Sequence, residues 1–207
     1  VDYEIITIDF GIYENTAALD LLGINYTMVS PTAFYDINLN EYDVLYIGWL
    51  FCDEYYYSCA IDSGLQVLYD RSSDISDFLE NGGGLVALSE YGVNLLDWQW
   101  LPFDIGYLGS NHKNDAEIID YEHPVNNNLT SESLSYWSNS IHNAFYPSEY
   151  PDFLSPITQD VSSGFPLTLA GNYNHLYGRI VLSGQDPDYH YTYGDIEACA
   201  IFILNAL

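Results

Sequence analysis

Short apolar runs alternate with segments of helical pattern along the first ninety residues. The apolar runs are rich in β-branched residues, which is typical of buried strands. Between them, apolar positions recur at helical spacing, and Gly23 and the run after Asn81 mark helix ends. We therefore expect strands at residues 3–10, 24–30, 43–48 and 85–88, and helices at residues 14–22 and 72–81, the second with serine capping. This alternation predicts an α/β fold with a doubly wound, mostly parallel sheet flanked by helices.

The second half of the chain has a weaker pattern. Residues 97–166 look like a less regular, insertion-like region, with strand-like stretches at 116–120 and 153–157. Two adjacent strands are then expected at 167–170 and 178–184, followed by a final helix at about 195–206. No internal repeat or low-complexity linker interrupts this order, so residues 1–207 are predicted to form a single domain.

The charge of the chain is extreme, with 30 acidic and 3 basic residues and a formal net charge of −27. Phosphate neutralisation needs Lys and Arg, so nucleic acid and anionic membranes are excluded as partners. The apolar fraction of 48% is that of a globular protein and not of a disordered acidic tail. The acidic surface has two interpretations. Either it keeps a halophilic protein soluble at high salt, where salt screens the repulsion between its charges, or it binds divalent cations that bridge neighbouring copies.

Several features favour an extracellular or cell-surface location. The chain starts at Val1, as a processed protein would, and glycosylation sequons begin at Asn25 and Asn128. Cys52 and Cys59 bracket a tyrosine-rich segment, where a disulfide and a pair of free thiols are equally consistent with the sequence. Cys199 is expected to be a small core residue of the last helix.

The segment 81–96 carries a family resemblance. Three glycines lead into the apolar run 85–88, the turn Ser89-Glu90-Tyr91-Gly92 follows, and a helix-like stretch comes next. It resembles the nucleophile elbow of class I glutamine amidotransferase-like domains. On that pattern Glu90 stands at the position of the catalytic cysteine, and a carboxylate cannot attack a glutamine amide as a thiolate does.

The end of the last predicted strand extends the resemblance. In the family this strand runs into His-Pro-Glu, and the matching residues here are Asp186, Pro187 and Asp188. The catalytic Cys, His and Glu would therefore map onto Glu90, Asp186 and Asp188, and amidotransferase activity is not expected. Residues 8–10, 18–23, 42–45 and 79–83 also resemble, in the same order, segments of secreted domains attached to peptidases and surface proteins.

Carboxylates follow several of the predicted strands. At one sheet edge, Asp9, Glu90, Asp186 and Asp188 could provide oxygen ligands for Ca²⁺, with Asp53 and Glu54 nearby; alternatively they point into solvent. An extended Asp186-Pro187-Asp188 segment would direct both carboxylates to one side. His123, His142, His175 and His190 show no zinc-motif spacing, so a zinc site is not expected.

These observations predict a non-catalytic extracellular structural or interaction protein without a cofactor, apart from Ca²⁺. Its partners would be itself, other cell-surface proteins or glycans, in a surface layer, filament or sheath, or it would be an accessory domain of an exported protein. The alternative is a carbohydrate-active hydrolase with Glu90 and Asp186 in acid–base roles, or a carbohydrate-binding domain without turnover. The 21 tyrosines would supply contact area in each case.

Overall fold

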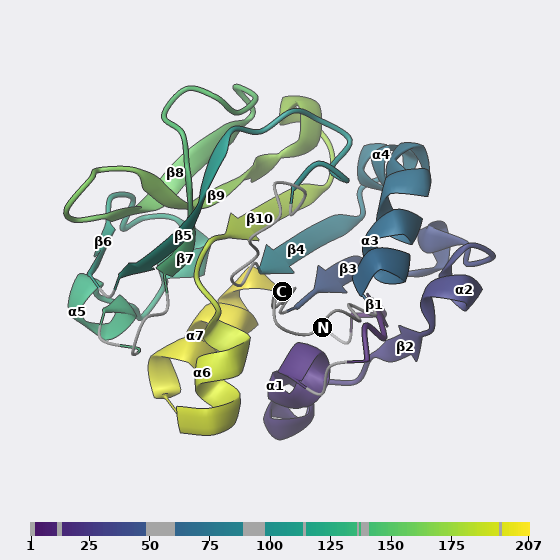
Figure 1. Ribbon diagram of the computed structural model, residues 1–207, viewed down its shortest axis with the longest axis horizontal. Coiled ribbons are helices and arrows are strands. Elements are labelled where there is room, and N and C mark those ends of the chain that lie inside the picture. Colours follow the sequence, from purple (N-terminus) through teal and green to yellow (C-terminus); the bar gives the residue numbers. More distant parts are fainter. Residues whose placement is uncertain are drawn as a thin grey trace.

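The computed structural model describes residues 3–11, 14–48, 61–88, 98–113, 115–135, 137, 141–194 and 196–207. Within these ranges, eight strands form one mixed sheet in the order β2-β1-β3-β4-β10-β9-β8-β6 (Figure 1). The first five strands of this order are parallel, and the last three are joined by antiparallel pairings. Their bounds are β1 Ile5–Ile8, β2 Thr27–Val29, β3 Val44–Ile47, β4 Gly84–Leu88, β6 Ala116–Ile118, β8 Leu154–Asp160, β9 Pro166–Asn172 and β10 Arg179–Ser183.

Helices cover both faces of the parallel half of the sheet. Figure 1 shows α3 and α4 on one side and α1, α6 and α7 on the other. The longer helices are α1 Glu14–Leu22, α3 Ile61–Asp70, α4 Ser72–Glu80, α6 Pro187–Gly194 and α7 Glu197–Ala206; short ones are α2 Pro31–Phe34 and α5 Ser131–Leu134. Three 3₁₀ turns complete the described elements: η1 Leu39–Glu41, η2 Pro124–Asn126 and η3 Tyr173–His175.

The central strands are buried on both faces because their side chains alternate between two hydrophobic cores. Leu85 and Ala87 of β4 lie in the core beneath α3 and α4. Val86 and Leu88 lie in the opposite core, with residues of α1 and α7. A strand buried on both faces needs a continuous apolar run, which explains why residues 85–88 could be identified from sequence. The predicted α/β class with a mostly parallel sheet and flanking helices is confirmed.

Most predicted elements of the first half agree with the structure. α1 has the predicted bounds, and β3 and β4 fall where the apolar runs placed them. The predicted serine cap of α4 is wrong: the N-cap residue is Arg71, which directly follows α3, and its guanidinium has no acceptor atom for a capping bond. The expected turn and helix at residues 89–96 lie outside the described residues.

The region 97–166 is more regular than predicted. β6 and β8 extend the main sheet, at the strand-like stretches that the sequence indicated. β5 Tyr107–Lys113 and β7 Ile141–Phe145 form a separate antiparallel pair, and β7 packs against β9. None of the helices in the described ranges combines the length and the apolar character that crossing a membrane requires.

The predicted extended Asp186-Pro187-Asp188 segment is wrong, because Pro187 is the first residue of α6. Proline suits the first position of a helix, since its φ is already helical and the missing N–H would have had no partner there. Asp186 therefore lies just before the helix and Asp188 within its first turn. Because α6 is a helix, side chains three and four residues apart at its start lie on the same face.

Candidate functional site

Asp186 lies at the carboxyl end of β10, shortly after Ser183, the last residue of the strand. Open α/β sheets place their sites at this edge. Both Asp186 and Asp188 are fully buried, and so is Gln185, whose Nε2 donates to the Leu134 carbonyl at 3.1 Å. The two carboxylates therefore belong to the protein interior and not to the solvated acidic surface.

Two histidines contact the Asp186 carboxylate from different elements. Nε2 of His142, on β7, lies 3.2 Å from Asp186 Oδ2. Nε2 of His190, on α6, lies 3.2 Å from Asp186 Oδ1. The side chains of Asp186, His142 and His190 are 1%, 7% and 10% exposed, so the contacts are closed to bulk water. We call these three residues the His–Asp–His cluster.

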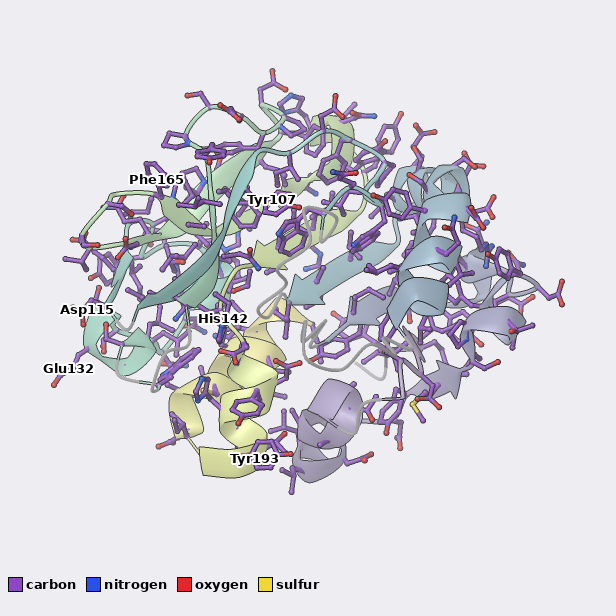
Figure 2. The ribbon with its side chains drawn as sticks, in the orientation of Figure 1. Tyr107, Asp115, Glu132, His142, Phe165 and Tyr193 are labelled. Atoms are coloured by element: carbon purple, nitrogen blue, oxygen red, sulfur yellow. The ribbon has the colours of Figure 1, made fainter. Side chains whose placement is uncertain are left out.

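The geometry of α6 and of β7 brings the cluster together. His190 lies four residues after Asp186, and its backbone N–H donates to the Asp186 carbonyl at 3.3 Å. His142 comes from β7, which is distant in sequence. Its backbone N–H and that of Asn143 both donate to the Gly184 carbonyl, at 3.0 and 3.1 Å, and these bonds hold β7 beside the end of β10. Figure 2 shows His142 where the β5–β7 pair meets α6.

A glycine is required at this junction. A Cβ built on Gly184 would lie 2.1 Å from the Asn143 carbonyl oxygen, closer than real contacts allow. Any side chain at residue 184 would therefore push β7 away from the end of β10. The close approach of the two backbones thus depends on Gly184, and so does the position of His142.

Aromatic and ionisable groups surround the cluster. The Tyr189 ring meets the His190 ring edge-on at 5.3 Å between centroids, and Trp137 lies 6.3 Å away. Burial, with added repulsion from Asp186 and Asp188, raises the pKa of the Cys199 thiol far above its usual range. Burial and the Asp188 charge likewise raise the pKa of Tyr46 well above its ordinary value. The carboxylate charges therefore raise the pKa of buried groups on both β3 and α7.

No arginine whose side chain is described offsets these carboxylates. Arg71 pairs with Asp74 at 2.7 Å and donates to the Phe34 carbonyl. Arg179 begins β10 and so lies at the opposite end of that strand. Within the described part of the chain, the side chains that reach Asp186 with nitrogen atoms are those of His142 and His190.

The chemistry open to the cluster follows from its ligand atoms. Two imidazole nitrogens and one carboxylate oxygen lie within 4.8 Å of one another. The imidazoles can pair with the carboxylate at ion-pair distance, or the three groups can coordinate one metal ion. Because Asp186 is buried between the two rings, its carboxylate has no exposed oxygen with which to exchange protons with a substrate.

The other predicted metal ligands are not gathered here. Asp9 follows β1 and is exposed, and its Oδ1 accepts the Gly11 N–H at 2.8 Å. Three strand spacings separate β1 from β10, or roughly 14 Å, which is too far for one ion. Asp188 is buried beside the cluster but does not belong to the group of close ligand atoms. Of the predicted Ca²⁺ ligands Asp9, Glu90, Asp186 and Asp188, the structure therefore does not bring Asp9 to Asp186, and Glu90 lies outside the described residues.

Several predictions fall on parts of the chain outside this description. Glu90, Cys52, Cys59, Asp53 and Glu54 lie outside the described residues. The sequon asparagines Asn25 and Asn128 are both exposed, and Asn128 has a positive φ of 60°. Cys199 is a free, buried core residue, as predicted.

Sequence reasoning missed both histidines of the cluster. The argument against zinc relied on local spacing, whereas His142 joins Asp186 only through the packing of β7. His190 carried a usable signal: a helix starting at Pro187 places Asp186 and His190 four residues apart on one face. No local pattern could have identified His142, because its contact with Asp186 is long-range.

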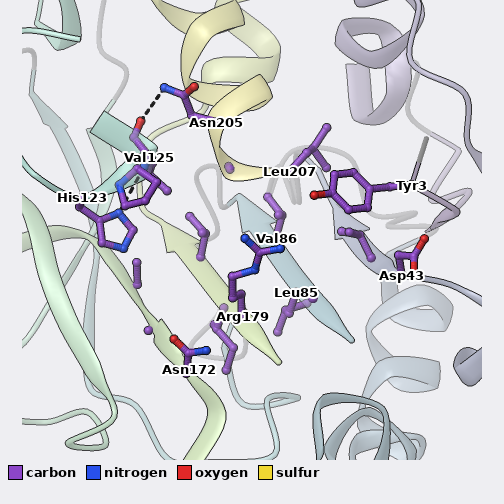
Figure 3. A pocket seen from close by; sticks show the side chains of 18 of the residues that line it. Tyr3, Asp43, Leu85, Val86, His123, Val125, Asn172, Arg179, Asn205 and Leu207 are labelled. Carbon is purple, nitrogen blue, oxygen red and sulfur yellow. Dashed lines mark hydrogen bonds between the residues drawn. The ribbon is translucent and has the colours of Figure 1, made fainter. Parts of the chain in front are cut away.

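A pocket of about 410 Å³ lies at the other end of the sheet, near the amino ends of β4 and β10 (Figure 3). Arg179, Tyr3 and His123 contribute polar groups to its lining, and Asn205 Nδ2 donates to the Val125 carbonyl at its rim. Partial burial lowers the pKa of His123, although Asp120 acts in the opposite direction. Among the described residues, none of those predicted from sequence as site residues lines this pocket.

Comparisons with known proteins identify the fold. No family model matches the sequence, and no curated protein matches it. The crystal structure of a candidate GMP synthase component from Thermoplasma acidophilum aligns with a TM-score of 0.57 and 14% identity, covering 100% of this chain and 92% of that one. The chain thus has a glutamine amidotransferase-like fold.

A second structural match is to part of a larger enzyme. The β-galactosidase from Bacillus circulans sp. alkalophilus aligns with a TM-score of 0.52 and 13% identity, covering 96% of this chain and 30% of that chain. At such low identity the likeness concerns the fold alone.

Proposed function

We propose that the chain is a non-catalytic amidotransferase-like domain that acts as an extracellular interaction module. The observation that carries this proposal is the burial of Asp186 and Asp188, the two residues that the sequence resemblance aligns with the family's base and its orienting carboxylate. Asp186 is 1% exposed, and His142 and His190 lie against its two carboxylate oxygens. In the sequence pattern of the family, Glu90 and Asp186 take the places of the cysteine and the histidine, and a carboxylate cannot replace either group in that mechanism.

The same observation disfavours the hydrolase alternative. Glycoside hydrolysis needs two carboxyl groups that flank the bond and reach the substrate. Asp186 is 1% exposed and both of its oxygens face imidazoles, so it is poorly placed to serve as acid or base. The geometry thus favours a fold that is kept for binding.

The surface suits contact with other molecules. Exposed tyrosines such as Tyr121 and Tyr193 offer large contact area at low entropy cost, and Leu176 is 81% exposed. Repulsion between copies with a net charge of −27 would be reduced by divalent cations, so Ca²⁺-dependent self-assembly at the cell surface is the expected mode. The exposed positions of Asn25 and Asn128 are compatible with glycosylation outside the cell.

An accessory role within a longer exported protein is the second form of this proposal. The match to β-galactosidase covers 30% of that chain, so this fold occurs as one part of a larger carbohydrate-active protein. A glycan is therefore a second candidate partner, bound without turnover.

Light scattering of the purified protein, with and without millimolar Ca²⁺ across a salt series, tests the proposal. Growth into large, EDTA-reversible species is the expected result. A monomer that is indifferent to Ca²⁺, EDTA and salt would overturn self-assembly, and a glycan array would then test the accessory role. Turnover of glutamine or of a glycoside by the wild type would overturn the non-catalytic assignment.

A further inference from the structure

The His–Asp–His cluster has the composition and spacing of a transition-metal site. We propose that His142, Asp186 and His190 bind one Zn²⁺ ion, which joins β7 to the start of α6. This inference does not depend on self-assembly. Asp186 is the one proposed Zn²⁺ ligand that was also a predicted Ca²⁺ ligand.

The distances in the cluster fit coordination. Zinc lies about 2.0–2.2 Å from imidazole nitrogen and carboxylate oxygen, so two ligands of a tetrahedral ion are about 3.3–3.6 Å apart. Each histidine Nε2 lies 3.2 Å from its own oxygen of Asp186. All three ligand atoms lie within 4.8 Å of one another, so small rotations of the rings would bring them to one ion.

The ligand types select the class of metal. Imidazole nitrogen suits zinc and neighbouring first-row metals, whereas Ca²⁺ and Mg²⁺ prefer sites made of oxygen atoms. Two nitrogen ligands out of three therefore favour Zn²⁺ over Ca²⁺, even in a protein whose surface is rich in carboxylates. The fourth position of a tetrahedral ion would take water.

Charge also favours a cation at this position. Asp186 is fully buried, and burying a carboxylate is costly unless a positive charge lies nearby. Arg71 and Arg179 lie elsewhere in the fold. A divalent ion between the histidines would offset the charge of the buried Asp186 carboxylate.

The ion would connect segments that are distant in sequence. His142 belongs to the β5–β7 pair, whereas Asp186 and His190 belong to the end of β10 and to α6. Coordination would add to the two hydrogen bonds that Gly184 accepts from β7. Since zinc binds the assembled ligands, it would stabilise the folded state.

Titration of the metal-free, full-length protein with Co²⁺ and Zn²⁺ tests the proposal directly. Co²⁺ substitutes for Zn²⁺ and gives visible absorption bands whose intensity reports four-coordinate ligation. We expect one equivalent to bind, an excess of Ca²⁺ to leave the bands unchanged, and Zn²⁺ to displace Co²⁺. A hundredfold excess of free Zn²⁺ over Kd should raise Tm by about 5–10 °C.

Variants assign the ligands. His142→Ala and His190→Ala should each weaken Zn²⁺ binding by about 100-fold or more, since even outer-shell changes cost about 10–100-fold. His175→Ala is the matched control, because His175 pairs with Asp152 at 3.1 Å but is 59% exposed on the surface. This control should bind Zn²⁺ as the wild type does.

The wild-type titration decides the question even if a variant fails to fold. Bands that excess Ca²⁺ removes would show adsorption to the acidic surface and would overturn the proposal. An intense near-ultraviolet thiolate band would assign the metal to cysteine and would overturn it as well. Absence of any bound equivalent would have the same consequence.

Discussion

Cys199 shows how the buried carboxylates affect a single residue. Its thiol remains protonated in the folded protein, because burial and the charges of Asp186 and Asp188 raise its pKa far above the ordinary 9.0. In the unfolded chain the thiol ionises near that ordinary value. Stability is therefore fully present below pH 9 and falls as pH rises above it.

We predict that the free energy of unfolding falls above pH 9 more steeply in the wild type than in Cys199→Ala. The difference in slope should approach about 1.4 kcal/mol per pH unit, which corresponds to one proton. Urea denaturation at several pH values, under reducing conditions, measures it. Equal slopes would mean that the thiol ionises in the folded protein.

Gly184 is the second residue on which the site depends. We predict that Gly184→Ala destabilises the protein by about 1–3 kcal/mol, because its Cβ would press on the Asn143 carbonyl 2.1 Å away. Gly84→Ala is the control, since its nearest neighbours would lie at an ordinary 3.5 Å, and it should change stability by about 0.5 kcal/mol or less. Equal losses of stability for Gly184→Ala and Gly84→Ala in chemical denaturation would contradict the close approach of β7 to Gly184.

At the scale of elements, α5 owes its start to a capping box. Thr130 Oγ1 accepts the Ser133 N–H at 3.0 Å, and Ser133 Oγ accepts the Thr130 N–H at 2.9 Å. Thr130→Ala should cost about 1 kcal/mol, whereas Thr130→Ser keeps the hydroxyl and should cost less. Thermal unfolding of protein produced without glycosylation measures this, because Thr130 also completes the sequon at Asn128. An alanine variant as stable as the serine variant would contradict the role of the cap.

The elements differ in how far the sequence revealed them. Strands β3 and β4 are continuous apolar runs, and α1 has an apolar face and a glycine stop, so local pattern sufficed. α6 was missed because its sequence, Pro-Asp-Tyr-His-Tyr-Thr-Tyr-Gly, lacks an apolar stripe, and packing against α1 and α7 supports it instead. The resemblance directed attention to residues 186–188, but the contact of Asp186 with His142 depends on tertiary packing that local patterns do not encode.

At the scale of the whole molecule, the charge of −27 opposes compaction. We predict that Tm rises by several degrees between low and high ionic strength, since a gain of about 1 kcal/mol shifts Tm by about 2–4 °C at this size. Equal increases in sodium chloride and choline chloride would identify screening as the cause. A Tm that stays constant or falls with salt would contradict a fold limited by self-repulsion.

The central claim is that His142, Asp186 and His190 form a closed cluster at the carboxyl end of β10. A crystal structure of the wild-type protein grown with Zn²⁺, with anomalous diffraction data at the zinc edge, tests it most directly. The account predicts an anomalous peak between His142, Asp186 and His190, with Asp186 shielded from solvent. An Asp186 carboxylate that faces an open, solvent-filled cleft, with both histidines turned away from it, would contradict the account.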